Sequence, residues 1–124
     1  VMEINGQRIG IFGLNTNLKG LTSPTTEKEL VFKDPIETAK NMVDLLQNKE
    51  HCDLIICLSH LGLDPVKTDD VSDKMVAEQV PGIDIIIGGH SHDYLSEPII
   101  INKTMILQSG LKGIYVGKMN IYTK

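Results

Sequence analysis

Apolar and polar positions divide the chain into segments with different periods. Two runs, DLIICL at 53–58 and IDIII at 83–87, are almost continuously apolar. Because a half-buried strand alternates apolar with polar residues, these runs predict strands that are buried on both faces of a sheet. Asp34-Pro35 supplies an N-cap and a first-turn proline, and apolar residues then recur at helical spacing, which predicts a helix over about 35–49.

The two ends of the chain show the pattern of short strands joined by turns. Asn5-Gly6 lies between two β-like runs and predicts a hairpin, because both residues tolerate a positive φ. From residue 97 onward the sequence predicts three strands in an antiparallel meander, with turns at 102–103 and 111–113. Residues 17–33 contain Gly, Pro and Thr without a sustained period and predict a long loop.

The middle of the chain has the order strand, helix, strand. A predicted helix over about 70–80, ended by Pro81-Gly82, separates the two apolar runs. This order indicates a βαβ unit, in which the two strands are parallel and hydrogen-bonded in one sheet. The predicted fold class is therefore α/β, a mixed sheet with two helices.

Three histidines follow the two apolar strands. His60 comes after the first strand, and His90 and His92 come after the second, behind two glycines that leave room for a turn or a bound group. The carboxyl ends of parallel strands form the edge at which open α/β sheets bind ligands. If 90–92 is extended, its two imidazoles point the same way with Cα atoms about 6.5–7 Å apart, at about 3.3 Å per residue. Such a spacing suits a pair of metal ions about 3.5–4 Å apart.

Other polar residues near this edge are weaker candidates. Asp93 is a candidate partner for orienting an imidazole. Ser59 and Ser91 are not candidate nucleophiles, since no order of base and acid supports a triad. His51 precedes the first strand, at the opposite end from the ligand edge, and is expected to be structural. The remaining carboxylates are expected to be solvated charges in a loop and at a helix start: Asp64, Asp69, Asp70 and Asp73.

Composition excludes several classes of partner. The chain has 124 residues, 41% hydrophobic and 23% charged, with a formal net charge of −4, so it offers no basic field for nucleic acid. No apolar run approaches the roughly 20 residues that span a bilayer, and the first residues lack the pattern of a signal peptide. Cys52 and Cys57 are expected on opposite faces of a strand, which disfavours a disulfide between them.

The segments LSHLG at 58–62 and GGHSH at 88–92 resemble the second half of the calcineurin-like metallophosphoesterase domain. The resemblance is to its 5'-nucleotidase and 2',3'-cyclic phosphodiesterase branch. Three further segments extend the resemblance over nearly the whole chain: IGIFGLNT at 9–16, PGIDIIIGGHSH at 81–92 and ILQSGLKGIYVGKMNI at 106–121.

The resemblance implies a fold, a cofactor and a reaction. The fold is a four-layer α/β/β/α sandwich, of which this chain would form half. The cofactor is a pair of divalent metal ions, drawn from Zn, Mn, Fe or Mg, with His60 and His90 on one ion and His92 on the other. The reaction is hydrolysis of a phosphate ester, with a nucleoside 5'-phosphate as the expected substrate.

Several motifs of the family do not occur in this sequence. Family members open with Asp-x-His, Gly-Asp and Gly-Asn-His-Asp or Gly-Asn-His-Glu, which supply the bridging aspartate and the histidine near the leaving group, and a nucleotide-binding domain follows. We therefore expect residues 1–124 to be a partial domain with three of the usual seven ligands, without catalytic residues of its own and inactive alone. Three imidazoles without an anionic bridge should hold Zn²⁺ or Mn²⁺ weakly at best.

Two other functions stay open. The chain could be a non-catalytic metal-binding or scaffold module that pairs with another chain, or a relative that handles sulfate esters or thiosulfate. The absent half would leave free backbone groups at a sheet edge and exposed apolar faces, so we expect a dimer or larger homo-oligomer. Nucleic-acid and membrane partners are not expected. The compartment is not determined, since family members are often secreted, periplasmic or surface-attached.

Overall fold

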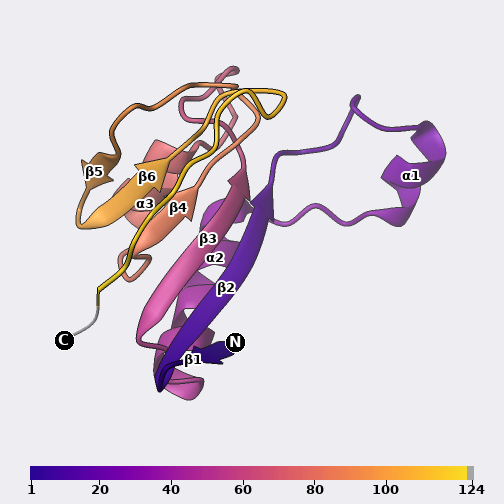
Figure 1. The fold of residues 1–124 in the computed structure, drawn as a ribbon. Helices are drawn as coiled ribbons and strands as arrows, with labels where there is room; N and C mark the ends of the chain where they lie inside the picture. Colours follow the sequence, from indigo (N-terminus) through magenta and orange to yellow (C-terminus); the bar gives the residue numbers. More distant parts are fainter. Residues whose placement is uncertain (123–124) are drawn as a thin grey trace.

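The computed structural model, which describes residues 1–122, contains one six-stranded mixed sheet (Figure 1). The strand order is β1-β2-β3-β4-β6-β5. The central strands β2, β3, β4 and β6 are parallel, and the two edge strands β1 and β5 are antiparallel to their neighbours. This confirms the predicted α/β class. The strands are β1 (Met2–Ile4), β2 (Gln7–Asn15), β3 (Leu54–His60), β4 (Ile85–Ile87), β5 (Ile99–Ile101) and β6 (Thr104–Leu107).

The helices begin where capping residues occur. The helix predicted over 35–49 is confirmed as α2 (Pro35–Asp44) continued by a π-helical turn, η1 (Leu45–Lys49). It begins at Asp34, whose carboxylate accepts a hydrogen bond from the N–H of Glu37 at 2.8 Å. The predicted helix at 70–80 is α3 (Asp73–Gln79).

A third helix lies in the segment predicted to be a loop. α1 (Pro24–Glu29) is a short helix capped by Ser23, whose hydroxyl accepts from the N–H of Thr26 at 3.2 Å. None of its residues is buried. A capped helix of this length needs no apolar stripe, so hydrophobic periodicity gave no sign of it.

The hairpin turns are confirmed, but the final meander is not. Asn5 and Gly6 connect β1 to β2 with φ of 53° and 79°, and Asn102 and Lys103 connect β5 to β6 with φ of 49° and 77°. No strand follows β6 within the described residues, so the predicted third strand is wrong. β6 pairs with β4 on one side and β5 on the other, which leaves no edge of β6 for another strand.

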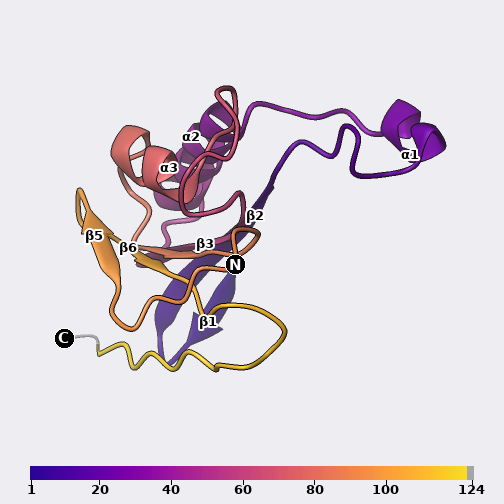
Figure 2. The ribbon, with the colours of Figure 1, turned by 90° about the horizontal axis from the view of Figure 1, so that it is seen from above.

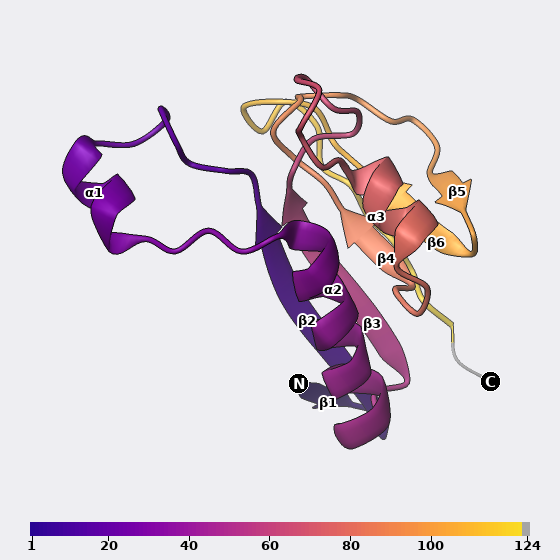
Figure 3. The same ribbon diagram turned by 180° about the vertical axis from the view of Figure 1, so that it is seen from behind.

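Only one face of the sheet is covered by helices. Figure 2 shows α2 and α3 on one face and the C-terminal segment (108–122) on the other side. Figure 3 shows α2 over β2 and β3, and α3 over β4 and β6. On the side away from the helices, which we call the open face, Ile11, Leu58 and Ile87 are exposed by 37%, 50% and 44%. The prediction of burial on both faces is therefore wrong at Leu58 and Ile87, which have no helix against them. It holds at the start of β4, where Ile85 and Ile86, on opposite faces, are both buried.

The helix-covered face carries the core. Ile86, Ile106 and Val76 are fully buried between the sheet and α3. Cys57 is buried in the same core and Cys52 is partly buried, and both are free thiols, as their spacing predicted. Among the described residues no helix has both the length and the apolar character needed to cross a bilayer.

Candidate metal centre

The ends of β3 and β4 form the edge at which the sequence placed its candidate ligands. β3 ends at His60, and β4 ends at Ile87, directly before the Gly-Gly-His-Ser-His segment. His60 is therefore the last residue of its strand and not a loop residue. In the parallel pairing of β2 with β3, Asn15 stands opposite His60, and the N–H of Thr16 donates to the carbonyl of His60 at 3.2 Å. We call this carboxyl edge the histidine edge.

Two of the three predicted histidines meet at the histidine edge. The rings of His60 and His90 have centroids 5.1 Å apart and lie edge to face, with 70° between their planes. Gly89 permits this approach, because a Cβ there would lie 3.2 Å from Nδ1 of His60. The βαβ unit therefore brings an imidazole from each of two neighbouring strands to one place.

The segment 90–92 is not extended, contrary to the assumption made from the sequence. His90 and His92 have φ of 74° and 61°, in the left-handed region that non-glycine residues occupy at a cost of about 1–3 kcal/mol. Ser91 between them turns its hydroxyl inward and accepts the N–H of Leu63 at 3.0 Å. His92 is exposed. Within residues 1–122, no three or more His, Cys, Asp or Glu side chains are grouped to hold one ion, so the expected convergence of all three histidines is not found.

The loops that follow β3 and β4 are packed against each other. Gly62, with φ of 95°, lies against the second loop, because a Cβ on it would sit 3.5 Å from both Cδ2 of His90 and Cβ of Ser91. The carbonyl of Gly62 accepts the N–H of Asp73 at 2.8 Å. The histidine loops are thus fixed to each other and to the start of α3.

Asp73 is a buried carboxylate that sequence reasoning misplaced. It is fully buried, although it was expected to be solvated. The hydroxyl of Ser59 donates to its Oδ1, while Oδ2 has no hydrogen-bond partner and lies against Gly88. Burial raises the pKa of Asp73 to about 6, and the hydrogen bond from Ser59 partly opposes that rise. Burial and the nearby charge of Asp73 raise the pKa of the Cys57 thiol to about 12.

One sequence signal could have located Asp73. Ser59 follows Ile55 and Cys57 at the strand period of two, which predicts its hydroxyl on the buried face, where it needs a polar partner. Asp64 is exposed, as expected, and pairs with Lys74 at 2.7 Å. Asp69 is also exposed and Asp70 is half-buried.

Gln108 is a second buried polar residue that was not identified from the sequence. Only 3% of it is exposed, and its Oε1 accepts the N–H of Asp93 at 2.7 Å. Within residues 1–122, Asp93 makes its hydrogen bonds through its backbone, so its expected role as an imidazole partner finds no contact. His51 lies at the opposite end of β3 from His60, where the sequence placed it.

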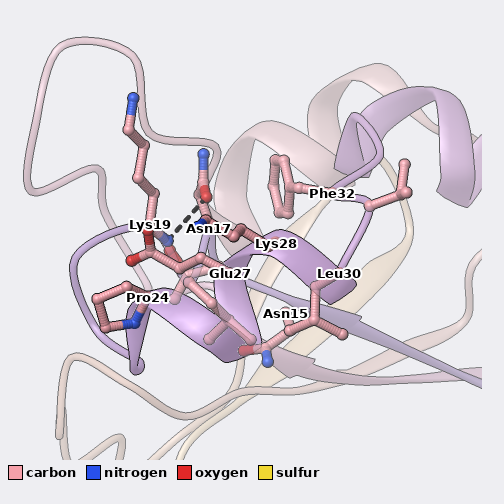
Figure 4. A pocket seen from close by; sticks show the side chains of 11 residues that line it. Asn15, Asn17, Lys19, Pro24, Glu27, Lys28, Leu30 and Phe32 are labelled. Atoms are coloured by element: carbon pink, nitrogen blue, oxygen red, sulfur yellow. Dashed lines mark hydrogen bonds between the residues drawn. The ribbon is translucent and has the colours of Figure 1, made fainter.

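A hollow adjoins the β2 side of the histidine edge. It has a volume of about 540 Å³ and is lined by residues at the end of β2, by α1 and by the segment that follows α1 (Figure 4). The N–H of Lys19 donates to Oδ1 of Asn17 at 3.0 Å at its rim. Asn15 both lines the hollow and pairs with His60, so the hollow opens beside the candidate ligands.

The chemistry of the histidine pair fits one part of a metal centre. Neutral imidazoles are suitable donors for Zn²⁺ and other first-row divalent ions. In the described part of the chain no carboxylate joins the pair to complete a ligand group. The fit is therefore to an incomplete centre, in which this chain provides nitrogen donors and no bridging oxygen.

Residues 4–94 match the family model of the calcineurin-like phosphoesterases. The trifunctional nucleotide phosphoesterase protein YfkN of Bacillus subtilis (strain 168) is 32% identical over 124 residues, which cover 98% of this chain and 8% of that protein. A 5'-nucleotidase of Diplobatis ommata is 35% identical over 95 residues, which cover 77% of this chain and 15% of that protein. This chain thus spans a small part of the length of either relative.

A solved structure supports the same assignment. The sulfate thiohydrolase SoxB of Thermus thermophilus, in complex with glycerol, superposes with a TM-score of 0.66 and 26% identity, covering 82% of this chain and 18% of that one. Calcineurin-like phosphoesterases use divalent metal ions and act on phosphate esters such as nucleotides. The fold, the paired imidazoles at the carboxyl edge and these similarities together show that the chain belongs to the calcineurin-like phosphoesterase family.

Proposed function

We propose that this chain contributes imidazole ligands to the dinuclear metal centre of a nucleotide phosphoesterase. His60 and His90 bind one divalent ion, and His92 binds the other. The observation that carries the proposal is the meeting of His60 and His90, with ring centroids 5.1 Å apart, at the carboxyl ends of two parallel strands. His92 lies in the same loop, has a positive φ of its own, and is exposed. This position suits a ligand to a separate ion.

The ions, when bound, supply positive charge to the phosphoryl oxygens and lower the pKa of a bound water. The residues of this chain hold and orient the imidazoles. Gly89 leaves room for His60, and the bond from the N–H of Leu63 to Ser91 fixes the loop that carries His90. A bridging carboxylate and an acid for the leaving group have to come from another part of the domain. We therefore propose that residues 1–124 are the second part of a metallophosphoesterase domain and are inactive alone.

A nucleoside 5'-phosphate is the substrate class we favour. The relatives with 32% and 35% identity are named as a nucleotide phosphoesterase and a 5'-nucleotidase. The similarity to a sulfate thiohydrolase supports a sulfur-ester substrate as a competing choice. An assay of the complete domain with AMP and with a sulfate ester separates the two choices.

The decisive experiment restores the complete domain. The chain alone should hydrolyse AMP at the background rate, even with Mn²⁺ or Zn²⁺ at about 1 mM, enough to saturate a site of ordinary affinity. Addition of the preceding half of the domain, taken from the Bacillus relative, should give hydrolysis that EDTA abolishes. In that complex His60→Ala and His90→Ala should each lower kcat/KM by about 100-fold or more, because the ion that they would hold supplies charge stabilisation at the reacting centre, where the loss of one such contact costs at least that much.

His51→Ala is the matched control, since His51 lies at the far end of β3 and should leave the rate unchanged. Equal rates for the His51 and His90 variants would refute the ligand assignment. Chelator-resistant hydrolysis by the chain alone would refute the proposed reaction.

A non-catalytic module that pairs with another chain is the second candidate. The exposed apolar residues Ile11, Leu58 and Ile87 on the open face favour it. A stable complex with the preceding half that lacks metal-dependent hydrolysis would support this candidate over the enzyme.

A further inference from the structure

The loop that carries His90 and His92 is held in place by hydrogen bonds of the residues next to the two histidines. Among the described residues neither histidine has a hydrogen bond from its own backbone or side chain to another part of the chain, although both have a positive φ. A strained backbone persists only where the surrounding structure fixes it. The residues next to the histidines, Ser91 and Asp93, carry the hydrogen bonds that do so.

Both of these neighbours bind to one buried side chain. Oε1 of Gln108 accepts the N–H of Asp93 at 2.7 Å, and its Nε2 donates to Oγ of Ser91 at 3.3 Å. The carbonyl of Gln108 also accepts the N–H of Leu95 at 3.0 Å. Gln108 directly follows β6, the strand that pairs with β4, so it reaches the histidine loop from the adjacent strand end.

Ser91 also connects the loop of His90 and His92 to the loop that follows His60. Its Oγ accepts the N–H of Leu63 at 3.0 Å, in the loop that follows His60. Gln108 is 3% exposed, so water does not compete for its amide, and removal of the amide would leave the donor on Asp93 without its partner.

We propose that Gln108 is a positioning residue for the metal-binding histidines, acting through Ser91 and Asp93. It fixes the backbone of 90–92 in the left-handed turns and thereby sets the directions of both imidazoles. This inference rests on the proposed function in treating His90 and His92 as ligands. It goes beyond that function, because Gln108 lies outside the matched region 4–94 and, among the described residues, makes no hydrogen bond to either imidazole.

The test uses the full chain and observes the imidazoles directly by NMR. Gln108→Met keeps the volume of the side chain and removes its hydrogen bonds. We expect the ring resonances of His90 and His92 in the metal-free chain to shift, while those of His51 stay unchanged. The midpoint of a Zn²⁺ titration should rise about tenfold or more, as for other residues that orient a ligand. Ser91→Ala should shift the same two histidines, and the double variant should add little to Gln108→Met.

Gln79→Met is the matched control, because Gln79 is exposed on α3. It should leave the histidine resonances and the Zn²⁺ midpoint unchanged. A folded Gln108→Met chain with the wild-type resonances of His90 and His92 would overturn the proposal. If that variant fails to fold, unchanged histidine resonances in Ser91→Ala would overturn it. Absence of Zn²⁺ binding by the wild-type chain would count against the ligand assignment, and the metal-free spectra would still decide the role of Gln108.

Discussion

Asp73 shows how a single residue at the start of a helix can couple the sheet to the histidine loops. Its carboxylate is fully buried, with Ser59 on one oxygen and the other oxygen against Gly88. A buried carboxylate without a cation is unfavourable when charged, so its pKa rises from an ordinary 3.8 to about 6. The folded chain therefore binds a proton at this site at pH values where the unfolded chain does not.

This proton uptake predicts a pH dependence of stability. Because the folded pKa exceeds the unfolded pKa, the contribution of Asp73 to stability is greatest below pH about 4 and falls as pH rises through about 6. The loss should amount to about 3 kcal/mol, from a shift of about two pKa units. Asp73→Asn cannot ionise and should lack this loss. Urea unfolding of both chains between pH 4 and 7.5 in EDTA measures it. A difference between the two chains that does not change with pH would contradict the raised pKa.

A side chain at position 88 is expected to destabilise the fold. A Cβ at this position would overlap Oδ2 of Asp73, which cannot retreat because Ser59 binds its other oxygen. Gly88→Ala should lower the free energy of unfolding by about 1–3 kcal/mol, as other overpacked cores do. Gly117→Ala is the control, since a Cβ there would meet nothing within 4 Å. Similar urea midpoints for the two alanine variants would show that this contact is absent.

At the scale of elements, the segment 17–33, which includes α1, differs from the helices that cover the sheet. It extends away from the sheet (Figure 3), and α1 has no buried residue. By contrast, α2 buries Pro35, Ile36, Ala39 and Val43. Segments with few buried apolar contacts open locally at a low free energy. We therefore expect 17–33 to open more readily than α2.

Limited trypsin digestion checks this expectation. Cleavage after Lys19, Lys28 or Lys33, all in or at the end of this segment, should precede cleavage within α2. Lys40 is an exposed lysine on α2, where it pairs with Glu37 at 2.8 Å, and it serves as the internal control. Mass spectrometry of early time points identifies the sites. Cleavage after Lys40 as early as after Lys28 would contradict the difference in local stability.

At the scale of the whole molecule, the sheet has helices on one face only. Leu58 is 50% exposed on the open face, where Ile87 stands opposite it on β4 and Gly13 stands opposite it on β2. Ile11 is exposed on the same face, two residues before Gly13. Exposed apolar side chains in a contiguous patch favour association. The chain by itself is therefore expected to form dimers or larger oligomers through this face.

Sedimentation velocity at micromolar concentration measures the oligomeric state. Leu58→Lys places a charge in the patch and should shift the distribution toward the monomer. Val66→Lys makes the same kind of change at a loop residue that is 72% exposed, and should have little effect. A monomeric wild-type chain would contradict association through the open face.

Local sequence patterns were sufficient for α2, for the first hairpin and for the parallel pair that brings His60 to His90. Helix 35–49 followed from a capping residue and a period of 3.6, and the hairpin followed from Asn5-Gly6. The parallel pair followed from strand, helix and strand in order, and it put His60 and His90 at one edge. The helix and the hairpin depend on residues close together in the chain, and the parallel pair depends on the order of such local elements, so the sequence alone predicts them.

Contacts between distant residues decided the rest. The burial of Asp73 depends on Ser59 and Gly88, and the support from Gln108 depends on the insertion of β6 beside β4. The left-handed backbone at His90 depends on Ser91 reaching the loop after β3. A polar residue near a helix start or a strand end has the same local pattern whether it is solvated or buried. Only the packing of separate segments determines which polar groups lose water and must find partners, and so only the tertiary structure could decide these features.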